Sequence, residues 1–188
     1  MEINELIKTI EQQLAELKEL AAQGAAKGQK DDRPVTERVK TFEDALRELG
    51  DEHPLVKQWR NFEAMTDSGE ATCDNADLVA YHKLRIITAA LNEGWEPTFA
   101  GGEWCYWPYY LLYTEEEWTD LSNEQKRDGL LVGGCADAGS VYLRPSYGPA
   151  LSGVRYGSRL CYKSEELALY SSKQFVELWA DCYLIRRA

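Results

Sequence analysis

Histidine is scarce in this sequence: His53 and His82 are the only two among 188 residues. Zinc sites and Ser-His triads draw on histidine, and a cysteine nucleophile would need one of these two as its base. The carboxylates give no distinct acid and base pair, because the clusters at 115–117 and 165–166 suit the first turns of helices. We therefore expect no enzymatic activity, no catalytic residue, no metal ligand and no cofactor.

Closely spaced cysteines are also lacking. The shortest interval within the set is 21 residues, and the set comprises Cys73, Cys105, Cys135, Cys161 and Cys182. This spacing excludes the CxxC motifs of zinc, redox and haem sites. We expect reduced thiols.

Long apolar runs are missing as well. The beginning, MEINELIKTIEQQ, has no signal-peptide core, and no apolar run reaches the roughly 18 residues of a membrane span. We expect synthesis in a cytoplasm, residence in a virion or in the host cytoplasm, and no membrane attachment.

Positive charge is in short supply. The chain has 32 acidic and 21 basic residues, which gives a net charge of −11. Such a surface repels phosphate backbones and anionic lipid, so direct nucleic-acid binding is disfavoured. The sequence is nevertheless that of a folded protein, because 44% of it is apolar and 11% is aromatic.

The N-terminal residues 1–24 predict an amphipathic, coiled-coil-like helix. Apolar residues follow a heptad stripe through residues 2–23, namely Ile3, Leu6, Ile10, Leu17 and Leu20. An isolated helix of this length is marginal in water, so the stripe needs a partner. It either packs on its own domain or joins copies in a homo-oligomer. The small and polar residues 25–35 predict a linker, and residues 36–188 a globular domain.

Capping signals predict four helices in that domain. Thr41 and Asp44 begin one that ends at Gly50, and Pro54 begins the next. The third covers residues 76–93, contains His82, and has an inward stripe of Leu78, Tyr81, Leu84, Ile87 and Leu91. Ser164 begins a last, long helix that runs towards Arg186 and Arg187.

The segments between the last two helices predict strands. Residues 104–113 are apolar at odd and even positions alike, which indicates a strand covered on both faces, and Pro108 requires an edge, bulge or kink there. Thr114 with Glu117 and Ser122 with Gln125 predict short inserted helices. Residues 129–162 predict short strands (LLV, VYL, RLCY) joined by tight loops. The fold class is therefore α+β: an N-terminal helix plus a mixed domain of short antiparallel strands flanked by helices.

Residues 133–158 stand apart in composition. They contain one acidic residue and two arginines, so they contribute +1 while the rest of the chain contributes −12. Tyr, Ser, Gly and Arg are the residues that make adaptable contacts in antibody paratopes. We therefore predict a variable binding surface at 133–158, whose candidate ligand-binding residues are Asp137, Ser140, Tyr142, Arg144, Tyr147, Arg155 and Tyr156.

The surrounding residues 128–162 contain no Lys, Glu, Gln, Met or Trp. These five types are the ones that codons ending in a pyrimidine cannot encode. Diversity-generating retroelements, which mutate adenines in AAC-type codons, produce that bias. Tight turns select Gly, Ser, Pro and Ala and so deplete long side chains too. Both explanations stay open.

Several segments carry a resemblance to a known group. They are ADLVAYHKLRIITAALNEGWEP, WCYWPYYLLYT and YGSRLCYKSEELALYSSKQFVELWADCYLI, of which GSRLCYKSEEL is the most specific. From about Thr41 to Ile185 the chain resembles uncharacterised proteins of phages and mobile elements in gut Bacteroidales. In that group the stretch before GSRLC varies, a layout similar to the hypervariable proteins of diversity-generating retroelements. The resemblance implies a C-type-lectin-like fold.

Two functions are consistent with these patterns. The first is a noncatalytic phage or mobile-element recognition protein that presents the variable surface on a rigid scaffold to a protein or glycan ligand. The alternative is an intracellular phage accessory or counter-defence protein that binds a host protein or a small nucleotide. Its aromatic pocket would be built from Trp104, Tyr106, Trp107 and Tyr109.

Overall fold

The computed structural model describes residues 31–67, 76–98, 103–127, 130–132, 141–151 and 158–184, and for residues 130–132 and 141–151 it describes the backbone. Contacts divide the chain into Met1–Arg33 and Pro34–Ala188. The second unit is described below. The predicted helix at 2–23 and residues 25–30 of the predicted linker lie outside the described residues.

Four helices open this unit, and local capping explains both ends of the second one. Thr41 and Asp44 form the predicted capping box: Thr41 Oγ1 accepts from the Asp44 amide at 3.1 Å, and Asp44 Oδ2 accepts from the Thr41 amide at 2.9 Å. Gly50, with φ 78°, ends that helix in a conformation that other residues rarely adopt. The helices are α2 (Val35–Arg38), α3 (Phe42–Leu49), α4 (Pro54–Asp67) and α5 (Ala76–Asn92).

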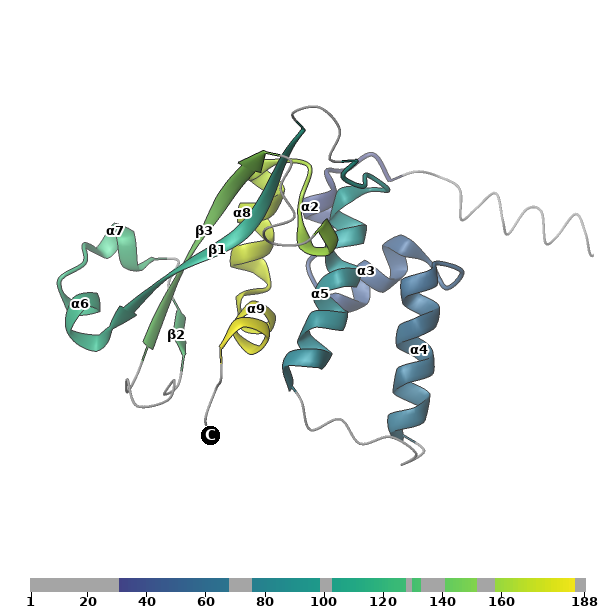
Figure 1. Cartoon of the computed structure of the whole chain (residues 1–188), viewed down its shortest axis with the longest axis horizontal. Helices are drawn as coiled ribbons and strands as arrows, with labels where there is room; N and C mark the ends of the chain where they lie inside the picture. Colours follow the sequence, from purple (N-terminus) through teal and green to yellow (C-terminus); the bar gives the residue numbers. More distant parts are fainter. Residues whose placement is uncertain are drawn as a thin grey trace, which may run out of the picture. The chain divides into compact units, whose positions relative to one another are not determined.

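Helix α5 lies at the centre of the helical layer, in contact with α3 and α4 and with the later helices α8 (Glu165–Gln174) and α9 (Val176–Tyr183) (Figure 1). Its predicted inward stripe is confirmed for Leu84, Ile87 and Leu91, which are fully buried. It is wrong for Leu78, which is 48% exposed because that first turn extends beyond the core. Gly94, with φ 84°, follows the helix where the sequence predicted its end.

A three-stranded antiparallel sheet packs beside these helices. Its order is β1-β3-β2, with β1 at Trp104–Thr114, β2 at Leu130–Val132 and β3 at Val141–Leu151. Strands β1 and β3 pair along their whole length, from Trp104 opposite Leu151 to Thr114 opposite Val141. Helices α6 (Glu115–Thr119) and α7 (Asn123–Lys126) lie between β1 and β2, and both have the predicted capping boxes. The architecture is α+β.

The prediction of uniformly short strands is wrong for β3. This strand has 11 residues and runs through Pro145, Gly148 and Pro149. Proline and glycine normally interrupt strands, but β1 pairs with β3 along its whole length, while β2 pairs only with Val141–Leu143 and leaves the other side of β3 open beside both prolines. The RLCY segment is not a strand either: it forms the 3-10 turn η1 (Ser158–Leu160), and Tyr162 then makes an isolated bridge to Tyr106.

Tyr162 lies along the edge of β1 that faces away from β3. The Tyr106 amide donates to the Tyr162 carbonyl at 3.1 Å, and the Tyr162 amide donates back at 2.8 Å. Residues two apart on a strand point their amides to the same side, so Pro108 has its missing N–H on this edge rather than towards β3. The predicted edge position of Pro108 is confirmed.

The last helix of the prediction is two helices, α8 (Glu165–Gln174) and α9 (Val176–Tyr183). Phe175 interrupts them with φ −115° and ψ 31°, outside the helical region. Its ring is buried and meets Tyr170 edge to face at 6.4 Å. A tertiary contact thus overrides local helix propensity at this residue. Helix α8 covers one face of the sheet, and α9 packs on α5 (Figure 1).

Polar groups in the core are linked to one another. The fully buried Tyr162 hydroxyl lies 2.9 Å from Thr88 Oγ1 and donates to Ser171 Oγ at 2.7 Å. Ser171 Oγ also accepts from Trp179 Nε1 at 3.1 Å. This network joins α5, α8, α9 and the segment before α8, and it leaves its members satisfied inside the core.

An ion-pair chain closes one end of the domain. Arg38 binds both Glu48 and Glu93, and Lys163 Nζ lies 3.0 Å from the second carboxylate. Hydrogen bonding from Lys163 lowers the pKa of Glu93. Glu93 has φ 51°, a strained conformation for a residue with a side chain. The ion pairs with Arg38 and Lys163 hold Glu93 in place. The same ion pairs join α2 and α3 to the segment before α8.

Candidate functional site

Three of the seven predicted ligand-binding residues lie in described segments. Tyr142, Arg144 and Tyr147 are on β3. The other four, Asp137, Ser140, Arg155 and Tyr156, lie outside the described residues, as do most positions of 133–158. The backbone pairing of β3 with β1 therefore gives the available geometry of the predicted surface.

The register separates these three residues. Tyr142 pairs with Tyr113 and Arg144 with Leu111, whereas Tyr147 pairs with Pro108. Directly paired residues share a face of an antiparallel sheet, and successive residues alternate between faces. Tyr142 and Arg144 therefore occupy positions on one face and Tyr147 a position on the other. The prediction that all three belong to one surface is wrong, because it ignored the period of two.

The two faces differ in their surroundings. Tyr106 packs against the main core, and the Tyr110 hydroxyl donates to the Ser172 carbonyl of α8 at 2.8 Å. The opposite face carries Tyr109, Leu111 and Tyr113, and it turns away from α8. We call this surface the outer sheet face; it consists of Tyr109, Leu111 and Tyr113 with the paired positions Ser146, Arg144 and Tyr142.

The outer sheet face is only partly covered. Tyr109 is 53% exposed, and Tyr113 meets Trp118 of α6 with their ring centroids 6.0 Å apart. On the other face of β1, Leu112 is also 53% exposed. The sequence predicted a strand buried on both faces, which holds for Cys105, Trp107 and Pro108 but is wrong for the second half of β1. That half extends beyond the helices that cover the first half.

The aromatic pocket of the alternative function does not form as predicted. Alternation places Trp104 and Tyr106 on one face of β1 and Trp107 and Tyr109 on the other. Trp107 is buried among Cys105 and Cys161, whereas Trp104 is 49% exposed. These four side chains therefore do not line one cavity.

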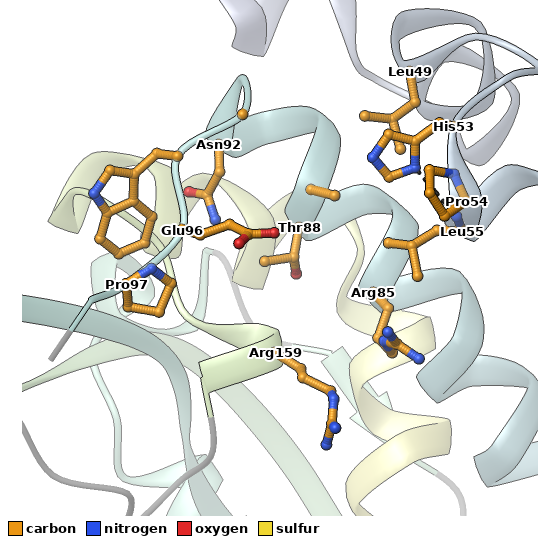
Figure 2. A pocket seen from close by; sticks show the side chains of 13 residues that line it. Leu49, His53, Pro54, Leu55, Arg85, Thr88, Asn92, Glu96, Pro97 and Arg159 are labelled. Carbon is orange, nitrogen blue, oxygen red and sulfur yellow. Dashed lines mark hydrogen bonds between the residues drawn. The ribbon is translucent and has the colours of Figure 1, made fainter.

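A different pocket lies on the helical side. It has a volume of about 520 Å³ and is formed by the turn from α3 to α4, the second half of α5, the segment after α5, and η1. Figure 2 shows His53 and Leu55 on one side of α5 and Glu96 and Pro97 on the other, with Arg159 on η1 below Arg85 in this view. Sequence reasoning did not find this site, because its residues come from four separate segments.

Some polar groups in the pocket already have partners. Asn92 Nδ2 donates to the Cys161 carbonyl at 2.8 Å, and Thr88 Oγ1 lies within hydrogen-bond distance of Tyr162. His53 Nδ1 accepts from the Leu55 amide at 3.3 Å. In a neutral imidazole the proton then lies on Nε2, so His53 keeps one donor for a ligand.

Trp95 forms one wall of the pocket, and a small cluster holds it there. Its ring packs against Cys105, Trp107 and Cys161. Its amide donates to the Asn92 carbonyl at 3.0 Å. The indole is thus fixed by contacts on its far side, while part of the ring remains accessible.

The two thiols beneath Trp95 should be unreactive. Both are fully buried and hydrogen-bonded to each other, and burial raises the pKa of Cys105 and raises that of Cys161 to about 12. A thiol with an ordinary pKa near 9 has about 1000 times more thiolate at pH 7.5 than Cys161 has. We expect iodoacetamide at pH 7.5 to modify Cys161 at least about 100-fold more slowly in the folded protein than in urea, measured by peptide mass spectrometry. Equal rates in both states would contradict the buried cluster.

Two other features of the described residues bear on function. None of their helices combines the length and the apolar character that crossing a membrane requires. Within the same residues, no three His, Cys, Asp or Glu side chains come together as a metal site would need. His82 stacks on Phe62 with ring centroids 6.0 Å apart, which is a packing role.

Comparison with known proteins gives no relative: no family model, curated protein or solved structure matches the chain. The function is therefore argued from the outer sheet face and the pocket themselves.

Proposed function

We propose that this chain is a noncatalytic recognition protein of a phage or mobile element, which binds a protein or glycan through the outer sheet face. One observation carries the proposal. Tyr109 is 53% exposed on a strand that pairs along its whole length with β3, the strand that holds Tyr142 and Arg144. The exposed aromatic is thus next to the segment with the paratope-like composition.

The outer sheet face has the properties of a binding surface. Continuous pairing of β1 with β3 holds Tyr109, Leu111 and Tyr113 on a rigid element. Tyrosine offers a large contact area and a hydroxyl at a small entropic cost. Arg144 lies in residues 133–158, which contribute +1 to a chain of net charge −11. A rigid aromatic surface beside a nearly neutral segment suits recognition better than it suits catalysis.

The scaffold is, in this proposal, related to the C-type-lectin-like fold. A helix, α5, followed by an antiparallel sheet supports the relation. Helices α8 and α9 after the last strand are an addition to that plan. An experimental structure that places residues 133–140 and 152–157 as loops beside the outer sheet face would support the relation, and one that buries them in the core would overturn it.

Self-association through residues 2–23 is part of the same proposal. Several copies held together bind a multivalent target with a higher avidity than a single copy does. A recognition protein of this kind would act in the virion or in the host cytoplasm. The heptad stripe of the sequence supports the association.

The experiment measures binding of the fluorescent full-length protein to intact gut Bacteroidales cells and to a glycan array. We expect saturable binding to some strains or glycans and a loss of about tenfold or more with Tyr109→Ser, because central aromatic side chains dominate binding energy. Leu112→Ser is the matched control, since Leu112 is equally exposed on the other face of the same strand. It should change binding by less than about twofold.

Two further arms sharpen the result. Removal of residues 1–30 should weaken cell binding by about 10- to 100-fold through lost avidity while the ratio between Tyr109→Ser and the parent chain persists. Sequencing the gene from related elements should show changes concentrated at 133–156 in adenine-bearing codons. Equal effects of the two serine variants, or uniform divergence along the gene, would contradict the proposal.

A further inference from the structure

The pocket beside α5 has the dimensions of a small-molecule site. Its volume of about 520 Å³ falls within the range of roughly 300–1,000 Å³ that ligand pockets occupy. None of the residues of the outer sheet face lines it, because its walls come from the helices, the segment 94–97 and η1. The recognition function does not use it.

Two arginines that line this pocket, Arg85 and Arg159, have no carboxylate partner among the residues that the structure describes. Elsewhere in the described residues, arginines bind acids: Arg38 binds Glu48 and Glu93, Arg47 binds Asp44, and Arg60 binds Glu63. Arg85 and Arg159 have no ion pair with any described residue. In a chain of net charge −11, two arginines left unneutralised at one cavity are unusual. They give the pocket a local positive charge that a bound anion would satisfy.

The one acid of the pocket does not cancel this charge. Glu96 is exposed, and its carboxylate points towards Thr88 on α5 (Figure 2). Neither arginine forms an ion pair with Glu96 within the described part of the chain. The described lining therefore keeps a net charge of about +1, and two guanidinium forks offer more donors than one carboxylate can accept, which favours the three terminal oxygens of a phosphate.

The remaining walls suit a flat, largely apolar body. Leu49, Leu55 and Pro97 line the pocket together with the Trp95 indole. Because Trp95 is fixed from behind by the Cys105, Trp107 and Cys161 cluster, it offers an aromatic surface without a large ordering cost. Stacking on such a surface is favourable for any aromatic ring. His53 adds one donor at the opposite wall.

We propose that this pocket binds a phosphomonoester carried on an aromatic or heterocyclic body, with its phosphate held by Arg85 and Arg159 and its ring against Trp95. The arginines lie on α5 and η1, so the ligand joins two segments that are far apart in the sequence. The ligand is small, of mononucleotide size, and the site does not require a polynucleotide.

The test is isothermal titration of the full-length protein with AMP, CMP, GMP, UMP and phenyl phosphate. We expect at least one of them to bind. Its dephosphorylated counterpart should bind at least about tenfold more weakly. Inorganic phosphate, which lacks the ring, should also bind at least about tenfold more weakly. Benzoate serves as the carboxylate arm, and tighter binding of benzoate than of every phosphomonoester would overturn the choice of phosphate.

Variants locate the site. Arg85→Gln and Arg159→Gln should each weaken binding of the responsive phosphomonoester by about tenfold or more, with unchanged circular dichroism. Arg47→Gln is the matched control: this arginine is exposed, pairs with Asp44 outside the pocket, and should leave affinity within about twofold. Two results would overturn the proposal. One is binding that survives both pocket variants. The other is the absence of any binding heat with all five phosphomonoesters at a concentration of about 1 mM, which is near the weakest useful affinity.

Discussion

Trp179→Ala is expected to lower the free energy of unfolding by about 3–5 kcal/mol, the cost of removing a large buried aromatic side chain. Trp179 is fully buried on α9 and packs within the main core beside α5. Its Nε1 donates to Ser171 Oγ, so the substitution removes packing and a buried hydrogen bond together. The measurement is urea unfolding followed by circular dichroism with linear extrapolation.

A milder pair of variants separates the hydrogen bond from the packing. Trp179→Phe retains an aromatic ring but leaves Ser171 without one donor, whereas Trp59→Phe removes a buried indole whose Nε1 has no hydrogen-bond partner among the described residues. We expect Trp179→Phe to cost about 1–2 kcal/mol more than Trp59→Phe. Equal costs would mean that the bond to Ser171 contributes nothing measurable. The comparison remains informative even if Trp179→Ala does not fold.

Features governed by neighbours in the sequence were predictable. The capping boxes of Thr41, Thr114 and Ser122 formed as the sequence indicated, because each needs only two residues three positions apart. Gly50 and Gly94 adopt positive φ where helices were expected to end. The α+β class followed from the same local signals.

Features governed by distant contacts were missed. Strand β3 continues through Pro145 and Pro149 because β1 pairs with it along its whole length, while β2 reaches only Val141–Leu143. The long terminal helix breaks at Phe175, which no proline or glycine signals, because that ring is buried in the main core. Leu78 fits the helical period but lies beyond the core. A sequence pattern gives the face of an element, while tertiary packing decides how far along the element burial extends.

The site was predictable in composition more than in geometry. The tyrosine-rich strand was identified, but its period of two separates Tyr147 from Tyr142 and Arg144. The pocket carried one weak signal, an arginine within the otherwise apolar second half of α5 at Arg85. No local pattern joins that residue to Arg159, 74 positions later, since η1 and α5 meet only in the folded chain.

The Asn92 side chain connects the end of α5 to the segment that follows η1. It is buried at the end of α5, where Nδ2 donates to the Cys161 carbonyl at 2.8 Å and Oδ1 accepts from the Lys163 amide at 3.1 Å. The side-chain amide of Asn92 thus forms hydrogen bonds with the backbone of residues 161–163, which lie along the free edge of β1, as a neighbouring strand would. The Asn92 carbonyl in turn accepts from Trp95, so one residue positions both the bridge of Tyr162 and the wall of the pocket.

Asn92→Ala is therefore expected to lower the free energy of unfolding by about 1–3 kcal/mol, because the buried Cys161 carbonyl loses its donor and the partly buried Lys163 amide loses its acceptor. Asn92→Asp, which is nearly isosteric, should also destabilise the protein at pH 7, since it replaces the donor to Cys161 with an acceptor. Asn61→Ala, at an exposed position of α4, is the control and should change stability by less than about 0.5 kcal/mol. All three variants are measured by urea unfolding. If Asn92→Ala unfolds at the same urea concentration as Asn61→Ala, the hydrogen bonds of Asn92 do not hold the segment of Tyr162 against α5.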